Sequence, residues 1–161
     1  MRSSFTALSL LAAGLLAAGA AQATGHAEVR YVAPENFTDA GFGAIERERT
    51  QNLLTRRIEQ LASRLPDGQV LKVEVIDVDL AGEIDWMSPH RLRVMGQLPD
   101  APRLSLRFEL TQGGQVVARG EERITDLSYL MRRSGLPRND ALPYESRMLT
   151  EWFDQRFASA R

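Results

Sequence analysis

Apolar residues recur along the chain at two different spacings, and each spacing predicts one kind of secondary structure. Over residues 103–110 apolar and polar residues alternate one by one, which is typical of a strand with one buried face. Over residues 45–65 apolar residues return every three or four positions, beginning with Ile45, which predicts an amphipathic helix. A second helix of this kind begins near Asp140 and carries an aromatic stripe that ends at Phe157.

Shorter alternating runs predict four further strands, at residues 27–33, 69–80, 91–95 and 116–124. In the run at 91–95, Leu92 and Val94 are expected to face inward. The alternation in the run at 69–80 slips at Ile76, which indicates either a bulge or a strand that is covered on both faces. Gly113 and Gly114 join the last two strands and predict a tight hairpin, because such turns need positive φ angles.

The order of these elements is β-α-β-β-β-β-α, with Asp39 as the expected cap of the first helix. Because each helix has a single apolar face, the order predicts an α+β two-layer sandwich. Its sheet is expected to be mainly antiparallel, with four or five strands and both amphipathic helices on one face. Arg119, Glu121 and Arg123 are expected to face Arg107 and Glu109 in a cross-strand charge ladder.

The N-terminus has the three parts of a secretory signal peptide. Arg2 precedes an apolar run over residues 5–21, and Ala21-Gln22-Ala23 is a small-x-small cleavage pattern. We therefore expect cleavage after Ala23, with residues 18–20 as a second candidate site. The apolar run is shorter than the roughly 20 residues that span a bilayer, which favours a cleaved signal over a retained anchor. Cleavage leaves 161 − 23 = 138 residues, the size of one domain over 24–161, with its core from about 27 to 158.

Composition and charge narrow the classes of protein further. The chain has no cysteine, so it carries neither a lipid-modified cysteine nor a disulfide, and its apolar core alone must hold it together. Its formal net charge is −1 with both signs interspersed, whereas nucleic-acid binding requires a concentrated basic face. We therefore expect no nucleic-acid partner, and neither a cofactor nor an oligomeric state is indicated.

Three segments resemble a known family. They are LPDGQVLKVEVIDVDLAGEI at residues 65–84, GEERITDL at 120–127 and PYESRMLTEWF at 143–153. In this order and spacing they are similar to the bacterial domain-of-unknown-function family 3016 (DUF3016), and the resemblance extends over residues 29–157. Its members are exported proteins of Gram-negative bacteria, which implies the periplasm. The resemblance implies no activity, substrate or catalytic residue.

An acidic cluster follows the slipped strand and is a candidate metal site. Asp-x-Asp followed by Gly82 is how a calcium loop begins, but the fifth and twelfth positions are Ala81 and Ser88, which supply no carboxylate. A lone histidine beside it is more often a surface residue than a zinc ligand. A solvated acidic loop is therefore the simpler interpretation, and no metal or catalytic site is assigned. The weak metal candidates are Asp77, Asp79, Glu83, Asp85 and His90.

Aromatic and basic residues in the predicted loops suggest a contact surface. Trp86 is either a protein-contact anchor or a side chain folded back over the sheet end. Arginines near residues 132–138 are either solvated or suited to phosphate, cell-wall carboxylate or an acidic partner. The candidate partner surface consists of Trp86, Arg107, Arg119, Tyr129, Arg132 and Arg133.

These observations favour a periplasmic binding or accessory module of the cell envelope, whose partner would be an envelope protein or a cell-wall component. The alternative is a small hydrolase or metal-dependent enzyme that uses the region of Asp77, Asp79 and His90. The chain has no Gly-x-Ser-x-Gly and no Ser-x-x-Lys motif. A binding module should expose a patch, such as the uncovered sheet face, whereas an enzyme should show a pocket with convergent titratable groups.

Overall fold

The computed structural model describes residues 24–96, 100–132, 136 and 139–157. The predicted signal peptide, residues 1–23, lies outside the described residues. Within the described ranges, no helix is both long and apolar enough to cross a membrane.

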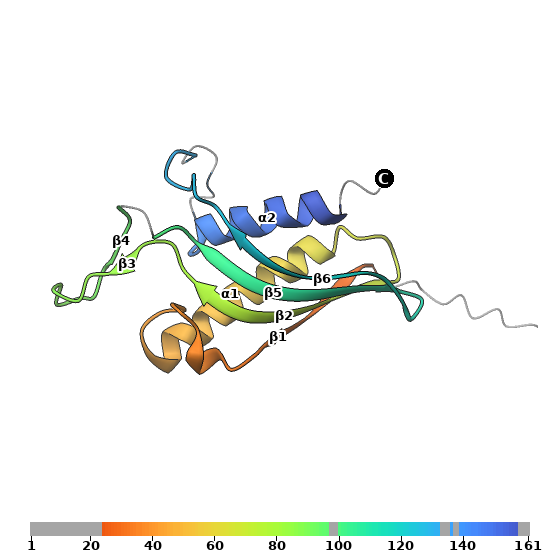
Figure 1. The fold of residues 1–161 in the computed structure, drawn as a ribbon, viewed down its shortest axis with the longest axis horizontal. Helices are drawn as coiled ribbons and strands as arrows, with labels where there is room; N and C mark the ends of the chain where they lie inside the picture. Colours follow the sequence, from red (N-terminus) through yellow and green to blue (C-terminus); the bar gives the residue numbers. More distant parts are fainter. Residues whose placement is uncertain (1–23, 97–99, 133–135, 137–138, 158–161) are drawn as a thin grey trace, which may run out of the picture.

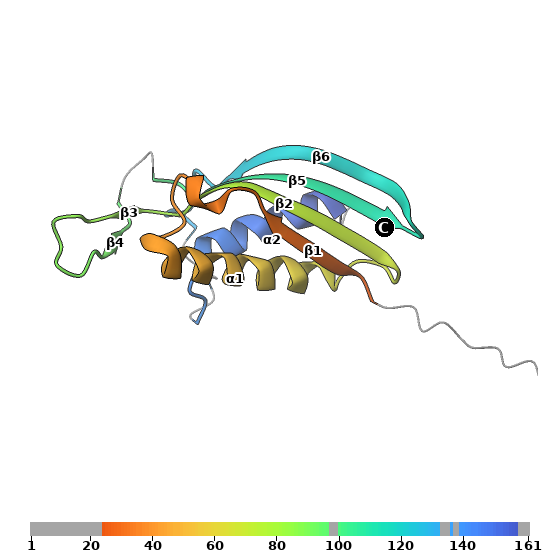
Figure 2. The ribbon, with the colours of Figure 1, turned by 90° about the horizontal axis from the view of Figure 1, so that it is seen from below.

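The chain forms two layers, a four-stranded sheet and a pair of helices on one of its faces (Figures 1 and 2). The strand order in the sheet is β1-β2-β5-β6. The predicted α+β sandwich with both helices on one face is therefore confirmed. The elements are β1 (His26–Tyr31), η1 (Pro34–Asn36), α1 (Gly43–Ala62), β2 (Gln69–Asp79), β3 (Glu83–Ile84), β4 (Arg93–Val94), β5 (Arg103–Gln112), β6 (Gln115–Thr125) and α2 (Pro143–Phe157).

The sheet is mixed. β1 pairs with β2 in parallel, whereas β2 pairs with β5, and β5 with β6, in antiparallel fashion. A parallel neighbour requires a long crossover connection, and the 20-residue helix α1 between β1 and β2 supplies it. The turn between β5 and β6 is the predicted hairpin, in which Gly113 and Gly114 have φ angles of 57° and 79°.

The slip in the alternation of β2 is a bulge. The register with β5 shifts between Val75 and Asp77, so that Ile76 is the extra residue. As a result Val75 and Val78 are both fully buried, although three positions separate them. Of the two alternatives that the sequence left open, the bulge is the one confirmed.

The predicted strand at 91–95 is wrong as a member of this sheet. Its only strand residues form β4, which pairs with β3 in a separate two-stranded hairpin. This hairpin projects from one end of the main body (Figures 1 and 2). Leu92 and Val94 are 59% and 51% exposed rather than inward, because a short alternating run gives a residue's side of the strand but not whether anything covers that side. We call residues 83–95 the arm.

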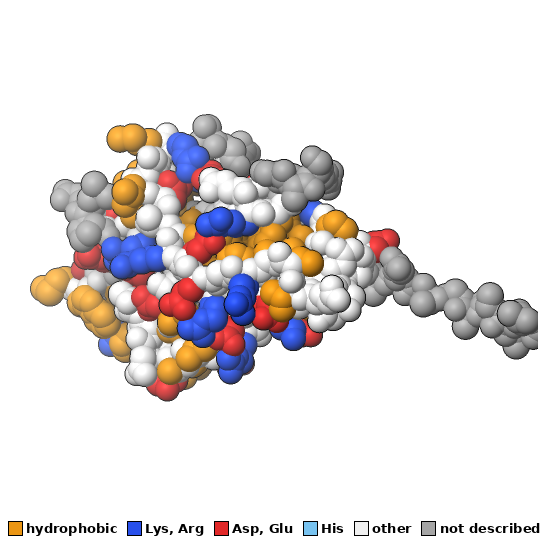
Figure 3. Space-filling model, turned by 45° about the vertical axis from the view of Figure 1, so that its right-hand side comes forward, with side chains coloured by type: hydrophobic (Ala, Val, Ile, Leu, Met, Phe, Trp, Pro, Cys, Tyr) orange, Lys and Arg blue, Asp and Glu red, His pale blue; other side chains and the backbone are white. Residues whose placement is uncertain are grey.

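The core lies between the sheet and the helices, and two predictions at the start of α1 are wrong. Ile45 is 84% exposed, so the buried stripe of α1 begins later, at Thr50 and Leu54. Phe42 rather than Asp39 is the N-cap, and its backbone N–H donates to Oε2 of Glu46 at 2.7 Å. Figure 3 shows a face on which hydrophobic side chains gather in a hollow and charged side chains surround them.

Candidate functional site

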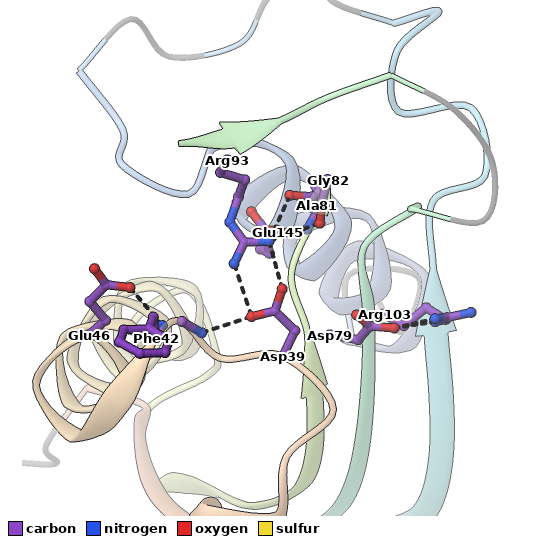
Figure 4. A network of polar contacts seen from close by, with 10 residues as sticks. Asp39, Phe42, Glu46, Asp79, Ala81, Gly82, Arg93, Arg103 and Glu145 are labelled. Carbon is purple, nitrogen blue, oxygen red and sulfur yellow. Dashed lines mark hydrogen bonds and ion pairs between the residues drawn. The ribbon is translucent and has the colours of Figure 1, made fainter. Parts of the chain in front are cut away.

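Arg93 of β4 attaches the arm to the segment that precedes α1. Its Nη1 and Nη2 donate to the two carboxylate oxygens of Asp39 at 2.8 and 2.9 Å (Figure 4). Nη1 also donates to the carbonyl oxygen of Gly82 at 2.8 Å. Arg93 and Asp39 are each only 22% exposed. A bidentate arginine–carboxylate pair of this kind fixes orientation as well as distance.

Glu145 of α2 also anchors the root of the arm. It lies in the first turn of α2, is 2% exposed, and its Oε1 accepts a hydrogen bond from the backbone N–H of Ala81 at 2.7 Å (Figure 4). Burial raises the pKa of this carboxyl above its ordinary value. The backbone of Ala81 is therefore held at both of its polar groups: its N–H donates to Glu145, and its carbonyl oxygen accepts from Nη1 of Arg93 at 3.4 Å.

The arm exposes an unusual amount of apolar side chain. Trp86 is 66% exposed, and its ring packs edge-on against Phe42 with 5.6 Å between the ring centroids. The guanidinium of Arg91 lies 3.8 Å from the centroid of the Phe42 ring. Arg91 has a φ angle of 47°, a left-handed conformation that costs energy for a residue with a side chain. We call the exposed apolar residues here the arm surface: Phe42, Trp86, Met87, Leu92 and Val94.

An open cleft of about 480 Å³ separates the arm from the end of the sheet. Phe42 and Trp86 line one part of it, and Asp39, Asp79 and Arg103 line another. Two of its carboxylates are paired with arginine: Asp39 with Arg93, and Oδ2 of Asp79 with Nε of Arg103 at 2.9 Å. The cleft therefore combines aromatic side chains with two carboxylates, Asp39 and Asp79, that are already bound to arginine.

The comparisons with known proteins give one result. The family model described as "Protein of unknown function (DUF3016)" matches residues 25–155. The chain belongs to the DUF3016 family. No curated protein and no solved structure matches it. The resemblance seen in the sequence is thus confirmed, and the DUF3016 description names no activity.

The five metal candidates of this DUF3016 chain are not brought together as a metal centre. Asp77 accepts hydrogen bonds from the backbone N–H and the hydroxyl of Thr38 at 2.8 and 2.9 Å. Asp85 accepts from the backbone N–H of Met87 at 2.9 Å, a bond within the turn of the arm. Glu83 and His90 are exposed. Among the described residues, no three His, Asp or Glu side chains gather closely enough to hold a metal ion.

The predicted basic loop is mostly engaged within the protein. Tyr129 is 2% exposed and packs edge-on against Tyr144 at 5.0 Å, so its prediction as a surface residue is wrong. Arg132 pairs with Asp126 at 3.1 Å and with Glu151 at 2.7 Å. Arg133, like Arg138, lies outside the described residues. The part of the loop that the structure describes is thus fastened to α2 rather than presented as free cations.

Asp126, which directly follows β6, is a buried anchor. Its side chain is 4% exposed, and Nη2 of Arg147 donates to it at 2.8 Å. Burial tends to raise the pKa of Asp126, but hydrogen bonds from Arg147 and Arg132 outweigh it and hold the pKa below its usual range.

The outer face of the DUF3016 sheet carries the last two candidates. Arg107 pairs with Glu74 at 3.0 Å and with Glu121 at 2.8 Å. Arg119 lies opposite Glu109 in the register of β5 and β6. Sequence reasoning found these residues but missed Arg93 and Glu145, because neither stands in a recognisable motif. The only signal for Glu145 was a carboxylate in the first turn of a predicted helix.

Proposed function

We propose that this protein is exported to the periplasm and acts there as a binding or accessory module of the cell envelope, with the arm surface as its contact site. The observation that carries the proposal is Trp86, which is 66% exposed on an arm whose root is tied down by Arg93 and Glu145.

The physical argument rests on apolar burial and preorganisation. Removing apolar surface from water contributes about 25 cal/mol per Å², and tryptophan is among the side chains that most often dominate binding energy. Because Arg93 and Glu145 already hold the root of the arm, its binding conformation requires little further ordering of that segment. An exposed Trp86 next to Met87, which is 92% exposed, is thus well placed to bury area against a partner.

The charges on the arm favour a protein as the partner. Glu83 and Asp85 are balanced by Arg91 and Arg93, so the arm lacks the basic excess that attracts anionic lipid surfaces. An apolar groove on an envelope protein matches a neutral surface of tryptophan, methionine and leucine.

Export is tested by the N-terminus of the mature protein. Protein purified from the periplasmic fraction should begin at Thr24 when its end is sequenced. A full-length chain that retains Met1 and fractionates with the cytoplasm would contradict this part of the proposal.

The contact site is tested by crosslinking in living cells. A photo-crosslinking residue at Met87 or Leu92 should repeatedly capture one envelope protein that can be identified by mass, whereas the same residue at Lys72 on the sheet face should not.

The captured protein is then purified for a direct binding measurement. Trp86→Ala should weaken binding at least tenfold, and Leu127→Ala is the matched control, because Leu127 is equally exposed (69%) but lies outside the arm. Equal capture at all three positions, or unchanged affinity of the Trp86 variant, refutes the proposed site.

A further inference from the structure

The sheet face turned away from the helices carries two rows of alternating charge that cross all four strands. In each row every residue lies opposite the next in register, and the signs of the second row are the reverse of the first. The predicted cross-strand ladder is confirmed for Arg119 and Glu121, whereas Arg123 lies opposite Ser105. The ladder also extends to β1 and β2, further than expected. The first row is Glu28, Lys72, Glu109 and Arg119; the second is Arg30, Glu74, Arg107 and Glu121.

The rows end at β6, which is an edge of the sheet. Each row ends on β6 with a charge that has a neighbour on one side only: Arg119 in the first row and Glu121 in the second. An edge strand also presents backbone N–H and C=O groups that another strand can pair with. β6 has 11 residues and no proline. Its charged side chains and a bulge at Val117 are features that can protect an edge, but the bulge lies near one end of the strand, and residues 118–122 around Gly120 keep a regular register.

The inner side of this edge is incompletely covered. On β5 the inward residue Leu106 is fully buried, whereas Glu122, its neighbour on β6, is only partly buried. Nearer the hairpin end of β6, a groove of about 290 Å³ is lined by Val117 and Ala118 of β6 and by Phe153 of α2, among others. The hollow of hydrophobic side chains in Figure 3 shows that apolar surface is accessible on the molecule.

We propose that β6 pairs with β6 of a second copy of this chain, antiparallel and about a two-fold axis at Gly120, which joins two sheets into one. In this register Arg119 of each copy lies opposite Glu121 of the other. The first row then continues into the second row of the other copy, and the signs alternate without interruption across eight strands. A two-fold contact of this kind is closed, so it yields a dimer and not a fibre.

The neighbouring registers do not preserve this alternation. A two-fold axis at Arg119 places the Arg119 side chains of the two copies opposite each other, and an axis at Glu121 places the two Glu121 side chains opposite each other. A centre at Glu122 brings together two inward-facing carboxylates, each already bonded by Trp152 Nε1 at 3.1 Å and by Arg156 at 2.7 Å. Like charges directly opposite each other destabilise a strand pair, so Gly120 is the favoured centre.

Charge exchange tests the pairing. Light scattering on the mature protein should give twice the mass of one chain. Arg119→Glu makes both facing positions acidic, Glu121→Arg makes both basic, and each variant alone should be monomeric with an unchanged circular dichroism spectrum. An equimolar mixture restores opposite charges and should give a dimer. Arg30→Glu is the control, because it introduces a like charge beside Glu74 at the opposite edge of the sheet and should leave the dimer intact. A monomeric wild-type protein, or a mixture that stays monomeric, overturns the proposal.

The register is tested independently with cysteines, since the natural chain has none. Directly opposite residues in an antiparallel pair have Cα atoms about 4.5–5.5 Å apart, within disulfide range. A mixture of Arg119→Cys and Glu121→Cys chains should therefore crosslink across the two copies under mild oxidation, and neither variant should crosslink with itself to a comparable extent. Efficient self-crosslinking of the Arg119→Cys chain would place the axis at residue 119 and refute the register.

Discussion

Replacing Arg93 by methionine should loosen the arm without unfolding the domain. The change keeps the apolar part of the side chain but removes the two hydrogen bonds to Asp39 and those to the carbonyl oxygens of Gly82 and Ala81. Hydrogen bonds to charged groups contribute about 1.5–3 kcal/mol each when measured singly. Both side chains are 22% exposed, and partial exposure weakens each bond, so we count the bidentate pair as one interaction. We therefore expect the free energy needed to open the arm to fall by about 2–3 kcal/mol.

Hydrogen exchange at a single amide measures this loss. The backbone N–H of Asp85 donates to the carbonyl of Leu92 at 2.8 Å across the arm, so it exchanges only when the arm opens. A loss of 2–3 kcal/mol corresponds to exchange that is roughly 30- to 150-fold faster. The amide of Val73, in the buried centre of β2, should keep its wild-type rate, because the sheet does not depend on this pair.

Arg103→Met is the matched control for this experiment. It removes an arginine–aspartate pair of the same kind at the same end of the sheet, but its partner Asp79 lies on β2 and not on the arm. The exchange rate of the Asp85 amide should therefore stay within about twofold of the wild-type rate, far below the roughly 30- to 150-fold increase expected for Arg93→Met. The reasoning is refuted if Arg93→Met leaves exchange at Asp85 unchanged, or if Arg103→Met accelerates it as much.

Three further predictions concern the other anchors. Because burial raises the folded-state pKa of Glu145, its contribution to the free energy of unfolding is greatest at acid pH and falls as the pH rises through that pKa. Glu145→Gln keeps the hydrogen-bond acceptor for Ala81 but cannot titrate, so it should flatten this part of the pH profile measured by chemical denaturation. An unaltered profile would contradict the role of Glu145. Asp126 has the opposite pH dependence: its lowered folded-state pKa stabilises the protein at pH values above the unfolded-state pKa, and this stability is lost on acidification. Asp126→Asn should therefore lower the free energy of unfolding by about 3 kcal/mol at neutral pH and by much less near pH 2. An equal loss at both pH values would refute the ion pair. Gly82 has a φ angle of 75°, and a Cβ there would lie 2.5 Å from the carbonyl oxygen of Val94. Gly82→Ala should therefore speed hydrogen exchange of the arm amides. An unchanged exchange rate would contradict this close approach.

The element types were predictable because they depend on neighbouring residues. The alternation over 103–110 is β5, the helical stripe before Leu65 is α1, and the slip at Ile76 is the bulge of β2. The run at 91–95 shows the limit of this reasoning. Alternation sorts residues onto two sides of a strand, and it cannot show that Leu92 would have nothing packed over it.

The candidate site was less predictable, since its contacts join distant parts of the chain. Arg93 and Asp39 are separated by 54 positions and Ala81 and Glu145 by 64, and none of them belongs to a recognisable motif. Trp86 could be singled out from sequence as an aromatic residue in a loop. Its exposure depended on how the arm leaves the body.

The sequence by itself determined the family, the four strands of the main sheet, the two α-helices, the two-layer class and the alternation of charge along each strand, since all of these are local patterns or sums over residues. Only the tertiary structure decided how the strands align, and therefore that Glu74, Arg107 and Glu121 fall into one row. It also decided that Tyr129 is buried while Trp86 is exposed. The physical reason is that burial and ion pairing depend on which distant parts of the chain pack together, and the same local pattern is compatible with many different packing arrangements.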